Sequence, residues 1–295
     1  MERPWIISCE STVDMPYDYL QVRHIPVLFY SYVLDGEEYP DDMMRDPQAL
    51  PAFYRRLEQG GVPATSQLNQ IQYEEFWEPL LQKSDVLHVA FGTGMTGSYY
   101  NAVKAAEVLR AKYPDRRLIV IDSTCSCSGY GLLTEMAADL KDDGQTMEQV
   151  EQWLLENRWR MHHQFYTSDL TFFRRSGRVS GIAAMIGGVL KLCPLMRLNR
   201  AGKIVAYGRV RGRQAALRAT LDEIERHARD HADYPGPCVV AHANCPQAAQ
   251  QMQQAIRERF PYIGTVRIYD IGNIIASHCG PGTVAVFFMG DVRRE

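Results

Sequence analysis

The chain has 295 residues, a formal net charge of −3 at pH 7, 46% hydrophobic residues and 23% charged residues. This balance is ordinary for a soluble globular protein and gives no reason to expect nucleic acid as a partner. The length favours two domains over one compact α/β core. The first residues lack the pattern of a secretory signal, no apolar run is long enough to span a bilayer, and the seven cysteines are an odd number. We therefore expect a cytoplasmic protein with reduced thiols and no stable membrane insertion.

The first half of the chain alternates short apolar runs with helical patterns. The apolar runs predict strands at residues 5–8, 27–30, 85–91 and 118–122. Helical patterns predict helices at residues 51–59, 73–82, 98–113, 130–141 and 147–158, the last of them behind a capping box that starts at Thr146. This alternation of strand and helix is typical of a doubly wound, mainly parallel sheet.

The second half has a different pattern. Residues 163–169 resemble a strand and lead into a charged turn at 174–181, and residues 192–213 predict two strands around a turn at 199–202. Such a hairpin pairs its strands antiparallel. Further elements are expected as a helix at 214–231, a strand at 238–241, a helix at 247–260 and a strand at 265–269. We therefore expect an α/β protein of two domains, residues 1–160 with the parallel sheet and residues 161–295 with a mixed or antiparallel sheet.

Gly92, Gly94 and Gly97 have the spacing G-x-G-x-x-G between a predicted strand and a predicted helix, and Asp122 ends the next strand. This arrangement is typical of a dinucleotide site and would suit an oxidoreductase. However, such a motif normally follows the first strand of its domain, and at least two predicted strands come earlier here. Two other interpretations stay open: a simple turn, or a helix N-terminus that binds a different anion.

Ten short motifs follow one another along almost the whole chain. They lie at residues 10–14 (ESTVD), 36–42 (GEEYPDD), 53–57 (FYRRL), 63–67 (PATSQ), 95–102 (MTGSYYNA), 120–133, 169–180, 191–204, 209–217 and 278–288 (HCGPGTVAVFF). In this order they resemble the DegV family of fatty-acid-binding proteins, bacterial carriers that present a fatty acid to a separate kinase. The resemblance implies that Thr96-Gly97-Ser98 is the part of the G-x-G-x-x-G segment that matches the family motif. The dinucleotide-type spacing of the three glycines is then a coincidence.

A fatty acid needs a dry apolar tunnel for its tail and hydrogen-bond donors for its carboxylate. The resemblance implies that the carboxylate meets the hydroxyls of Thr65 and Thr96 and the imidazole of His278, with the ligand between the two domains. Ser66, Gly97 and Ser98 of the same motifs are further candidate ligand contacts. Arg178 is a candidate entrance cation, and Arg175 is almost as good a candidate. Taken without the resemblance, the two threonines are also good helix caps, His278 could be a buried histidine, and the arginines could be solvated loop charges.

Residues 181–190 (GIAAMIGGVL) are apolar on every side, so they could wall the tail's tunnel or form a core helix between the domains. Cys125 and Cys127, with Cys9, Cys245 or His242, lack the spacing of a zinc site, so no metal is expected. The chain has no G-x-S-x-G and no Walker A pattern, which argues against an enzyme. We expect a lipid carrier without a cofactor, and a binder of another small amphiphile remains the alternative.

Arg209, Arg211 and Arg213 alternate along a predicted strand and would share one face. With Arg174 and Arg175 they could form a basic patch that attracts an acidic protein partner. The resemblance implies that this partner is a fatty acid kinase. A merely solvated strand face is the competing interpretation.

Overall fold

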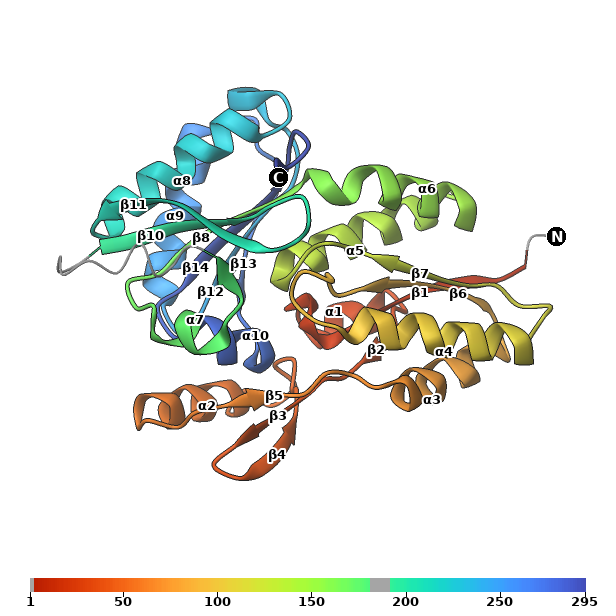
Figure 1. The fold of residues 1–295 in the computed structure, drawn as a ribbon. Coiled ribbons are helices and arrows are strands. Elements are labelled where there is room, and N and C mark those ends of the chain that lie inside the picture. Colours follow the sequence, from red (N-terminus) through yellow and green to blue (C-terminus); the bar gives the residue numbers. More distant parts are fainter. Residues whose placement is uncertain (1–2, 181–191) are drawn as a thin grey trace.

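The computed structural model describes residues 3–180 and 192–295, and these residues form three sheets and the helices around them (Figure 1). The first sheet is parallel and has the strand order β2-β1-β6-β7. Its strands are β1 (Trp5–Glu10), β2 (Val27–Leu28), β6 (Asp85–Ala90) and β7 (Leu118–Asp122). Every residue of β6 is buried, as expected for a central strand that is covered on both faces.

Helices cover both faces of this sheet. Figure 1 shows α3 and α4 on one side and α5 and α6 on the other, which confirms the expected doubly wound arrangement. The helices of this half are α1 (Tyr17–Val22), α2 (Ala49–Glu58), α3 (Gln70–Leu81), α4 (Ser98–Lys112), α5 (Cys127–Asp142) and α6 (Met147–Asn157). The predicted capping box is present, because the Thr146 side chain accepts from Gln149 N and the Gln149 side chain accepts from Thr146 N.

A small antiparallel sheet was not predicted. It has the order β4-β3-β5, with β3 (Ser31–Leu34), β4 (Glu37–Pro40) and β5 (Ala64–Thr65). Asp35 and Gly36, both at positive φ, form the tight turn between β3 and β4. The hairpin was missed because its strands are short and partly exposed, so they lack a strong apolar signal. Through β5 this sheet fixes the backbone of Thr65, which pairs with Tyr32.

The third sheet is mixed, with the order β13-β12-β14-β8-β10-β11-β9. Its strands are β8 (Met161–Tyr166), β9 (Val179–Ser180), β10 (Leu192–Leu198), β11 (Ile204–Arg211), β12 (Cys238–His242), β13 (Val266–Asp270) and β14 (Val284–Met289). The predicted hairpin is confirmed, because β10 and β11 pair antiparallel from Leu192–Arg211 to Leu198–Ile204. Helices α8 (Arg213–His227) and α9 (Pro246–Arg259) pack on this sheet.

Helix α5 lies between the two large sheets and contacts strands of both. Two glycines let it approach its neighbours closely. A Cβ on Gly129 would lie 2.5 Å from Nε2 of His163, and a Cβ on Gly131 would lie 2.5 Å from the carbonyl oxygen of Val13. Helix α5 is therefore packed closely against elements of both halves of the chain.

Some local expectations were wrong. Arg174 and Arg175 belong to a short helix, α7 (Thr171–Ser176), and not to a charged turn. Arg213 begins α8 and does not continue β11, because Gly212 at φ 83 turns the chain between them. A further helix, α10 (Asn273–Cys279), was not predicted.

Two other expectations have no structural outcome. The apolar segment 181–190 lies outside the described residues. The seven-stranded sheet begins with β8 at Met161, but the division of the chain into domains near residue 160 remains a prediction. Within residues 3–180 and 192–295, no helix has both the length and the apolar character that a membrane crossing requires.

Candidate functional site

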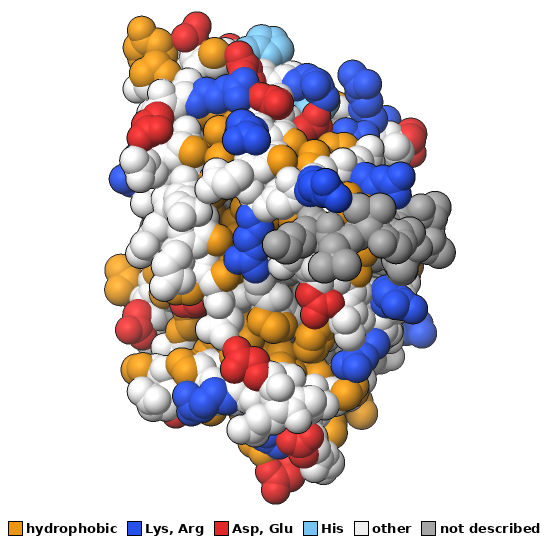
Figure 2. Space-filling model, turned by 90° about the vertical axis from the view of Figure 1, so that its left-hand side faces the viewer, with side chains coloured by type: hydrophobic (Ala, Val, Ile, Leu, Met, Phe, Trp, Pro, Cys, Tyr) orange, Lys and Arg blue, Asp and Glu red, His pale blue; other side chains and the backbone are white. Residues whose placement is uncertain are grey.

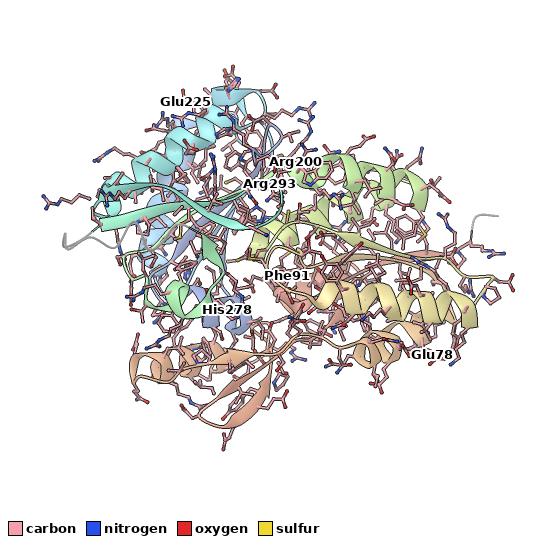
Figure 3. The ribbon with its side chains drawn as sticks, viewed as in Figure 1. Glu78, Phe91, Arg200, Glu225, His278 and Arg293 are labelled. Carbon is pink, nitrogen blue, oxygen red and sulfur yellow. The ribbon has the colours of Figure 1, made fainter. Side chains whose placement is uncertain are left out.

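A cavity with about 890 Å³ of empty space, its open mouth included, lies where the three sheets meet. Its wall is built by β5, the loop after β6, the start of α5, strands β8 and β14, and helices α7 and α10. The loops that follow β6 and β7 reach the cavity. They leave the carboxyl ends of these strands, and this is the edge where open α/β sheets commonly bind ligands. Most of the wall is apolar, and its large side chains include Phe165, Phe173, Ile204, Ile274, Ile275 and Phe287. In Figure 3, Phe91 marks the end of β6 and His278 marks the side of the cavity formed by α10.

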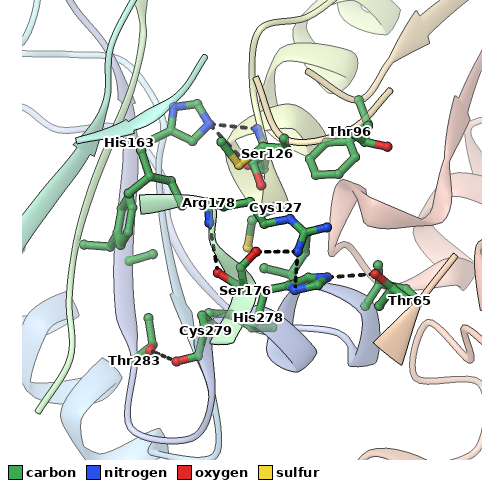
Figure 4. Close-up of a pocket in the computed structure, with 18 of the residues that line it drawn as sticks. Thr65, Thr96, Ser126, Cys127, His163, Ser176, Arg178, His278, Cys279 and Thr283 are labelled. Atoms are coloured by element: carbon green, nitrogen blue, oxygen red, sulfur yellow. Dashed lines mark hydrogen bonds between the residues drawn. The ribbon is translucent and has the colours of Figure 1, made fainter. Parts of the chain in front are cut away.

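Three polar side chains in the wall of this cavity form a hydrogen-bonded chain. Nε2 of His278 lies 2.8 Å from Oγ1 of Thr65, and Nη1 of Arg178 lies 3.2 Å from Nδ1 of His278 (Figure 4). These residues come from α10, β5 and the loop after α7. The structure thus brings together three of the side chains singled out in the sequence, although whether they bind a ligand remains a prediction.

The direction of this hydrogen-bond chain follows from the chemistry of its members. A guanidinium has only N–H donors, so Nδ1 of His278 must accept from Arg178. Burial, together with the charge of Arg178, lowers the pKa of His278 to about 4, so the imidazole is neutral at pH 7. Its single proton is therefore on Nε2 and is donated to Oγ1 of Thr65. The hydroxyl proton of Thr65 stays available for an acceptor in the cavity.

Arg178 also supplies a positive charge. Its Nη1 donates to the carbonyl oxygen of Ser176 at 2.8 Å as well as to His278, and burial lowers the pKa of its guanidinium. Among the described residues, no Asp or Glu forms an ion pair with it. A half-buried cation that lacks an acidic partner favours an anionic ligand. Arg175, the other candidate, is exposed on α7 over the ring of Phe172 and does not line the cavity.

The second predicted motif lies beside the first. Oγ of Ser98 accepts from Leu68 N at 3.1 Å and lies 2.9 Å from Oγ1 of Thr96, which itself accepts from Ser98 N. When Ser98 donates to Thr96, the Thr96 hydroxyl proton is left for another acceptor. Thr96 lines the cavity and so does Ser66, whereas Gly97 and Ser98 do not. Gly97 caps α4 and Ser98 is fully buried, so these two position the loop that carries Thr96.

Several lining residues were not found from the sequence. Nε2 of His163 accepts from Ser126 N at 3.1 Å, while Nδ1 donates to the carbonyl oxygen of Met161 at 3.0 Å. Burial lowers the pKa of His163 well below its usual value, so it is a neutral side chain that holds the start of α5. Tyr30 and Cys127 also line the wall. None of these residues belongs to a motif that the sequence marked for ligand binding.

The loop with Gly92 and Gly94 packs against neighbouring loops and does not form an open anion-binding site. A Cβ on Gly92 would lie 2.8 Å from the backbone of Cys125, and a Cβ on Gly94 would lie 2.3 Å from the carbonyl of Gly202. The carboxylate of Asp122 is already hydrogen-bonded within the protein, because it accepts from Thr93 N, Thr93 Oγ1 and Thr124 N at 2.6–3.1 Å. The features that suggested a dinucleotide site therefore hold the loop after β6 against the loop after β7 and the β10–β11 turn.

The model of the DegV family, described as an uncharacterised protein family, matches residues 5–291. A DegV domain-containing protein of Clostridium perfringens is 33% identical over 294 residues, which cover 99% of each chain. A fatty-acid-binding DegV family protein from Thermus thermophilus has a TM-score of 0.86 at 24% identity, over 98% of this chain and 100% of that chain. The fatty acid kinase B3 protein of Streptococcus pneumoniae, loaded with linoleic acid, has a TM-score of 0.83 at 19% identity, with coverage of 98% and 100%. The motifs and the family match agree over nearly the whole length, and the chain belongs to the DegV family.

Proposed function

We propose that this protein binds a long-chain fatty acid in the cavity and presents the carboxylate to a separate fatty acid kinase. The observation that carries the proposal is the Arg178–His278–Thr65 hydrogen-bond chain in the wall of a cavity whose large side chains are mainly apolar. This arrangement offers a hydroxyl donor and a cation to one end of a ligand and hydrocarbon contacts to the rest. A fatty acid has that division of chemistry.

The carboxylate accepts from the Thr65 hydroxyl, whose own oxygen is held by His278. The Thr96 hydroxyl is a second donor, and the half-buried charge of Arg178 compensates the negative charge. Charge-assisted hydrogen bonds of this kind are roughly twice as strong as neutral ones. Ser66, at the same cavity wall, is a further possible contact in this scheme.

The acyl chain lies along the apolar wall. Each buried methylene contributes about 0.8 kcal/mol, so a chain of about 16 carbons gains on the order of 12 kcal/mol before the cost of ordering both partners. Phe165, Phe173 and Phe287 supply large apolar surfaces, and Ile274 and Ile275 of α10 lie beside the head-group residue His278. The tail and the carboxylate would thus both be held by α10.

The protein would be a carrier without a catalytic step of its own. A separate kinase would transfer the γ-phosphoryl group of ATP to a carboxylate oxygen, giving an acyl phosphate and ADP. Support comes from the fold of the Streptococcus pneumoniae kinase protein that carries linoleic acid. Figure 2 shows several Lys and Arg side chains on one face of the molecule, with Asp and Glu side chains among them. The Lys and Arg side chains would suit an acidic protein partner.

The direct test is to identify and then replace the bound lipid. The purified protein is denatured, extracted with organic solvent and examined by mass spectrometry, and the delipidated protein is titrated with palmitate and oleate by calorimetry. We expect a fatty acid in the extract and saturable binding of one equivalent. An extract without fatty acid, combined with no heat of binding for either lipid, would contradict the proposal.

A further inference from the structure

Two histidines and an aspartate converge outside the cavity, near the end of the chain. Nε2 of His162 lies 3.0 Å from Oδ1 of Asp291, and Nδ1 of His227 lies 3.1 Å from the same oxygen. One potential ligand atom from each of the three residues lies within 4.8 Å of the other two. Around a tetrahedral zinc ion with bonds of about 2.0–2.1 Å, neighbouring ligand atoms are about 3.3 Å apart. A small outward movement would therefore bring these atoms to metal-ligand spacing.

The fold holds the three residues together firmly. His162 lies on β8, His227 is the last residue of α8, and Asp291 follows β14. Asp291 N donates to the carbonyl oxygen of His227 at 2.9 Å, and Ala228 forms a β-bridge with Gly290. A Cβ on Gly290 would lie 2.1 Å from the His227 carbonyl oxygen, so the absence of a side chain there permits the close approach.

The surroundings of His227 suit a metal ligand. Oε2 of Glu223 lies 3.5 Å from Nε2 of His227, on the side of the ring away from Asp291. At this distance the two groups form no hydrogen bond. A small closing movement would let the carboxylate hold a proton on Nε2 and leave the lone pair of Nδ1 for a metal, an arrangement common in zinc sites. Glu223 also faces Arg197 at 3.8 Å and pairs with Arg226, so its buried charge is balanced.

The other two ligands also have suitable environments. His162 is 4% exposed, and its Nε2 also lies 3.0 Å from the backbone carbonyl oxygen of Asp291. Because a carbonyl oxygen only accepts, this nitrogen carries the proton, which a bound metal would displace. The side chain of Asp291 is 52% exposed and lies in a surface depression together with His227, Arg160 and Arg229. An ion can reach Asp291 and His227 from this depression, with the buried His162 behind Asp291, and water can complete its coordination.

We propose that His162, His227 and Asp291 form a binding site for a divalent transition-metal ion such as Zn²⁺. The site joins β8, α8 and the C-terminal segment. It is linked to the loop before α5, because the buried Arg293, two residues after Asp291, donates to the carbonyl oxygen and hydroxyl of Thr124. The ion would therefore stabilise the arrangement of the C-terminal segment against the loop before α5. The site does not depend on the proposed lipid function.

The test uses the full-length protein after treatment with a chelator and its removal. Co²⁺ is added as a spectroscopic probe and Zn²⁺ as a competitor, and thermal unfolding is followed with and without metal. We expect one Co²⁺ per chain with a visible d–d band, displacement of that band by Zn²⁺, and a rise in Tm of about 5 °C at 100-fold excess over Kd. Asp291→Asn and His227→Gln should each lower the affinity at least tenfold.

His242→Gln is the matched control, because Nδ1 of His242 also lies near an aspartate, 3.5 Å from Asp270, and no third ligand joins them among the described residues. This variant should bind Co²⁺ like the wild type. If a variant unfolds, the Asp291→Asn substitution, which keeps the side-chain shape at an exposed position, still decides the matter. The proposal is overturned if no metal raises Tm and no d–d band appears, or if Asp291→Asn and His227→Gln bind Co²⁺ as tightly as the wild type. Lipid binding is measured separately and tests the carrier function alone.

Discussion

The imidazole of His278 and the hydroxyl of Thr65 are 2.8 Å apart, although 213 residues separate them in the chain. Strand β5 of the small antiparallel sheet fixes one of them and the last turn of α10 fixes the other. Because Arg178 occupies Nδ1, the imidazole donates to the threonine, and the threonine in turn can donate to a ligand. The two residues therefore act as one unit, and a change in either should affect the binding of an anion.

Replacement of Thr65 by valine should weaken fatty-acid binding by about 1–3 kcal/mol, because the variant loses a donor to the carboxylate and leaves Nε2–H of His278 unpaired. Thr65→Ser should bind nearly as well as the wild type, since it keeps the hydroxyl. Thr96→Ala should weaken binding by a similar amount. Calorimetric titration with palmitate measures all three, and Thr265→Val on the exposed surface is the control. Unchanged affinity in both Thr65→Val and Thr96→Ala would remove these residues from the site.

The stability of the delipidated protein should depend on pH through His278. The pKa of His278 is about 4 in the folded protein, below its ordinary value of about 6.5, so the unfolded chain takes up this proton first as the pH falls. The contribution of neutral His278 to the free energy of unfolding is therefore fully present above pH 6.5. It is lost as the pH drops from 6.5 to 4, by about 3 kcal/mol in total.

Other buried histidines, including His162 and His163, follow the same direction, so the measurement is a difference between two proteins. In His278→Gln the amide can accept from Arg178 and donate to Thr65 without titrating. Urea unfolding at pH 7 and at pH 4.5 should show a smaller loss of stability in this variant than in the wild type. Equal losses in the two proteins would mean that His278 does not carry a depressed pKa.

The local signals for the proposed head-group residues were strong, whereas the signals for the rest of the wall were weak. Thr65, Thr96, Arg178 and His278 lie in motifs that could be matched by residue type and order, and the structure places all of them at the cavity. His163 had no such signal. It lies within the short strand β8, and its contact with Ser126 depends on the packing of α5 against β8, which no local pattern reveals.

The fold shows the same limit. Long periodic segments such as α4 and α8 were predicted within a few residues, because their apolar spacing is maintained over several turns. Helix α10 was missed, since its seven residues carry two isoleucines among small and polar residues next to a Gly-Pro-Gly turn. The proposed metal ligands could not be found either, because His162 and His227 are far apart in the chain and Asp291 follows the last strand.

The glycine loop gives a prediction about stability. Gly94→Ala should destabilise the protein by about 1–3 kcal/mol, because its Cβ would lie 2.3 Å from the Gly202 carbonyl and one of the two loops would have to move. Gly208→Ala is the control, since a Cβ there would meet Leu195 at an ordinary 3.5 Å. Chemical denaturation measures both. A Gly94→Ala protein as stable as the wild type would show that the two loops are not held in close contact.

A nicotinamide cofactor should not bind. The backbone of Cys125 and the β10–β11 turn lie against Gly92 and Gly94, and Asp122 already accepts three hydrogen bonds from its neighbours. NAD and NADP added to the delipidated protein should leave Tm unchanged, while palmitate should raise it. A saturable rise in Tm with either dinucleotide would restore the oxidoreductase hypothesis.

The last prediction concerns the kinase. Arg209 and Arg211 alternate on β11 and are exposed, and neither forms an ion pair with a described residue. Alternate residues of a strand point to the same face, so the two charges can act together on an acidic partner. Arg213 starts α8 and donates to Ser168 Oγ, so it is left out of the patch.

Reversal of both charges, Arg209→Glu with Arg211→Glu, should leave palmitate binding unchanged and slow acyl-phosphate formation by the cognate kinase about tenfold or more at low salt. The difference should shrink as salt is added, because screening weakens the steering of the two proteins toward each other. The control is Lys83→Glu with Lys104→Glu, which reverses two exposed charges at α3 and α4. The kinase should phosphorylate the fatty acid bound to this variant at the wild-type rate. If the arginine variant also keeps the wild-type rate at every salt concentration, the kinase docks on another face of the molecule.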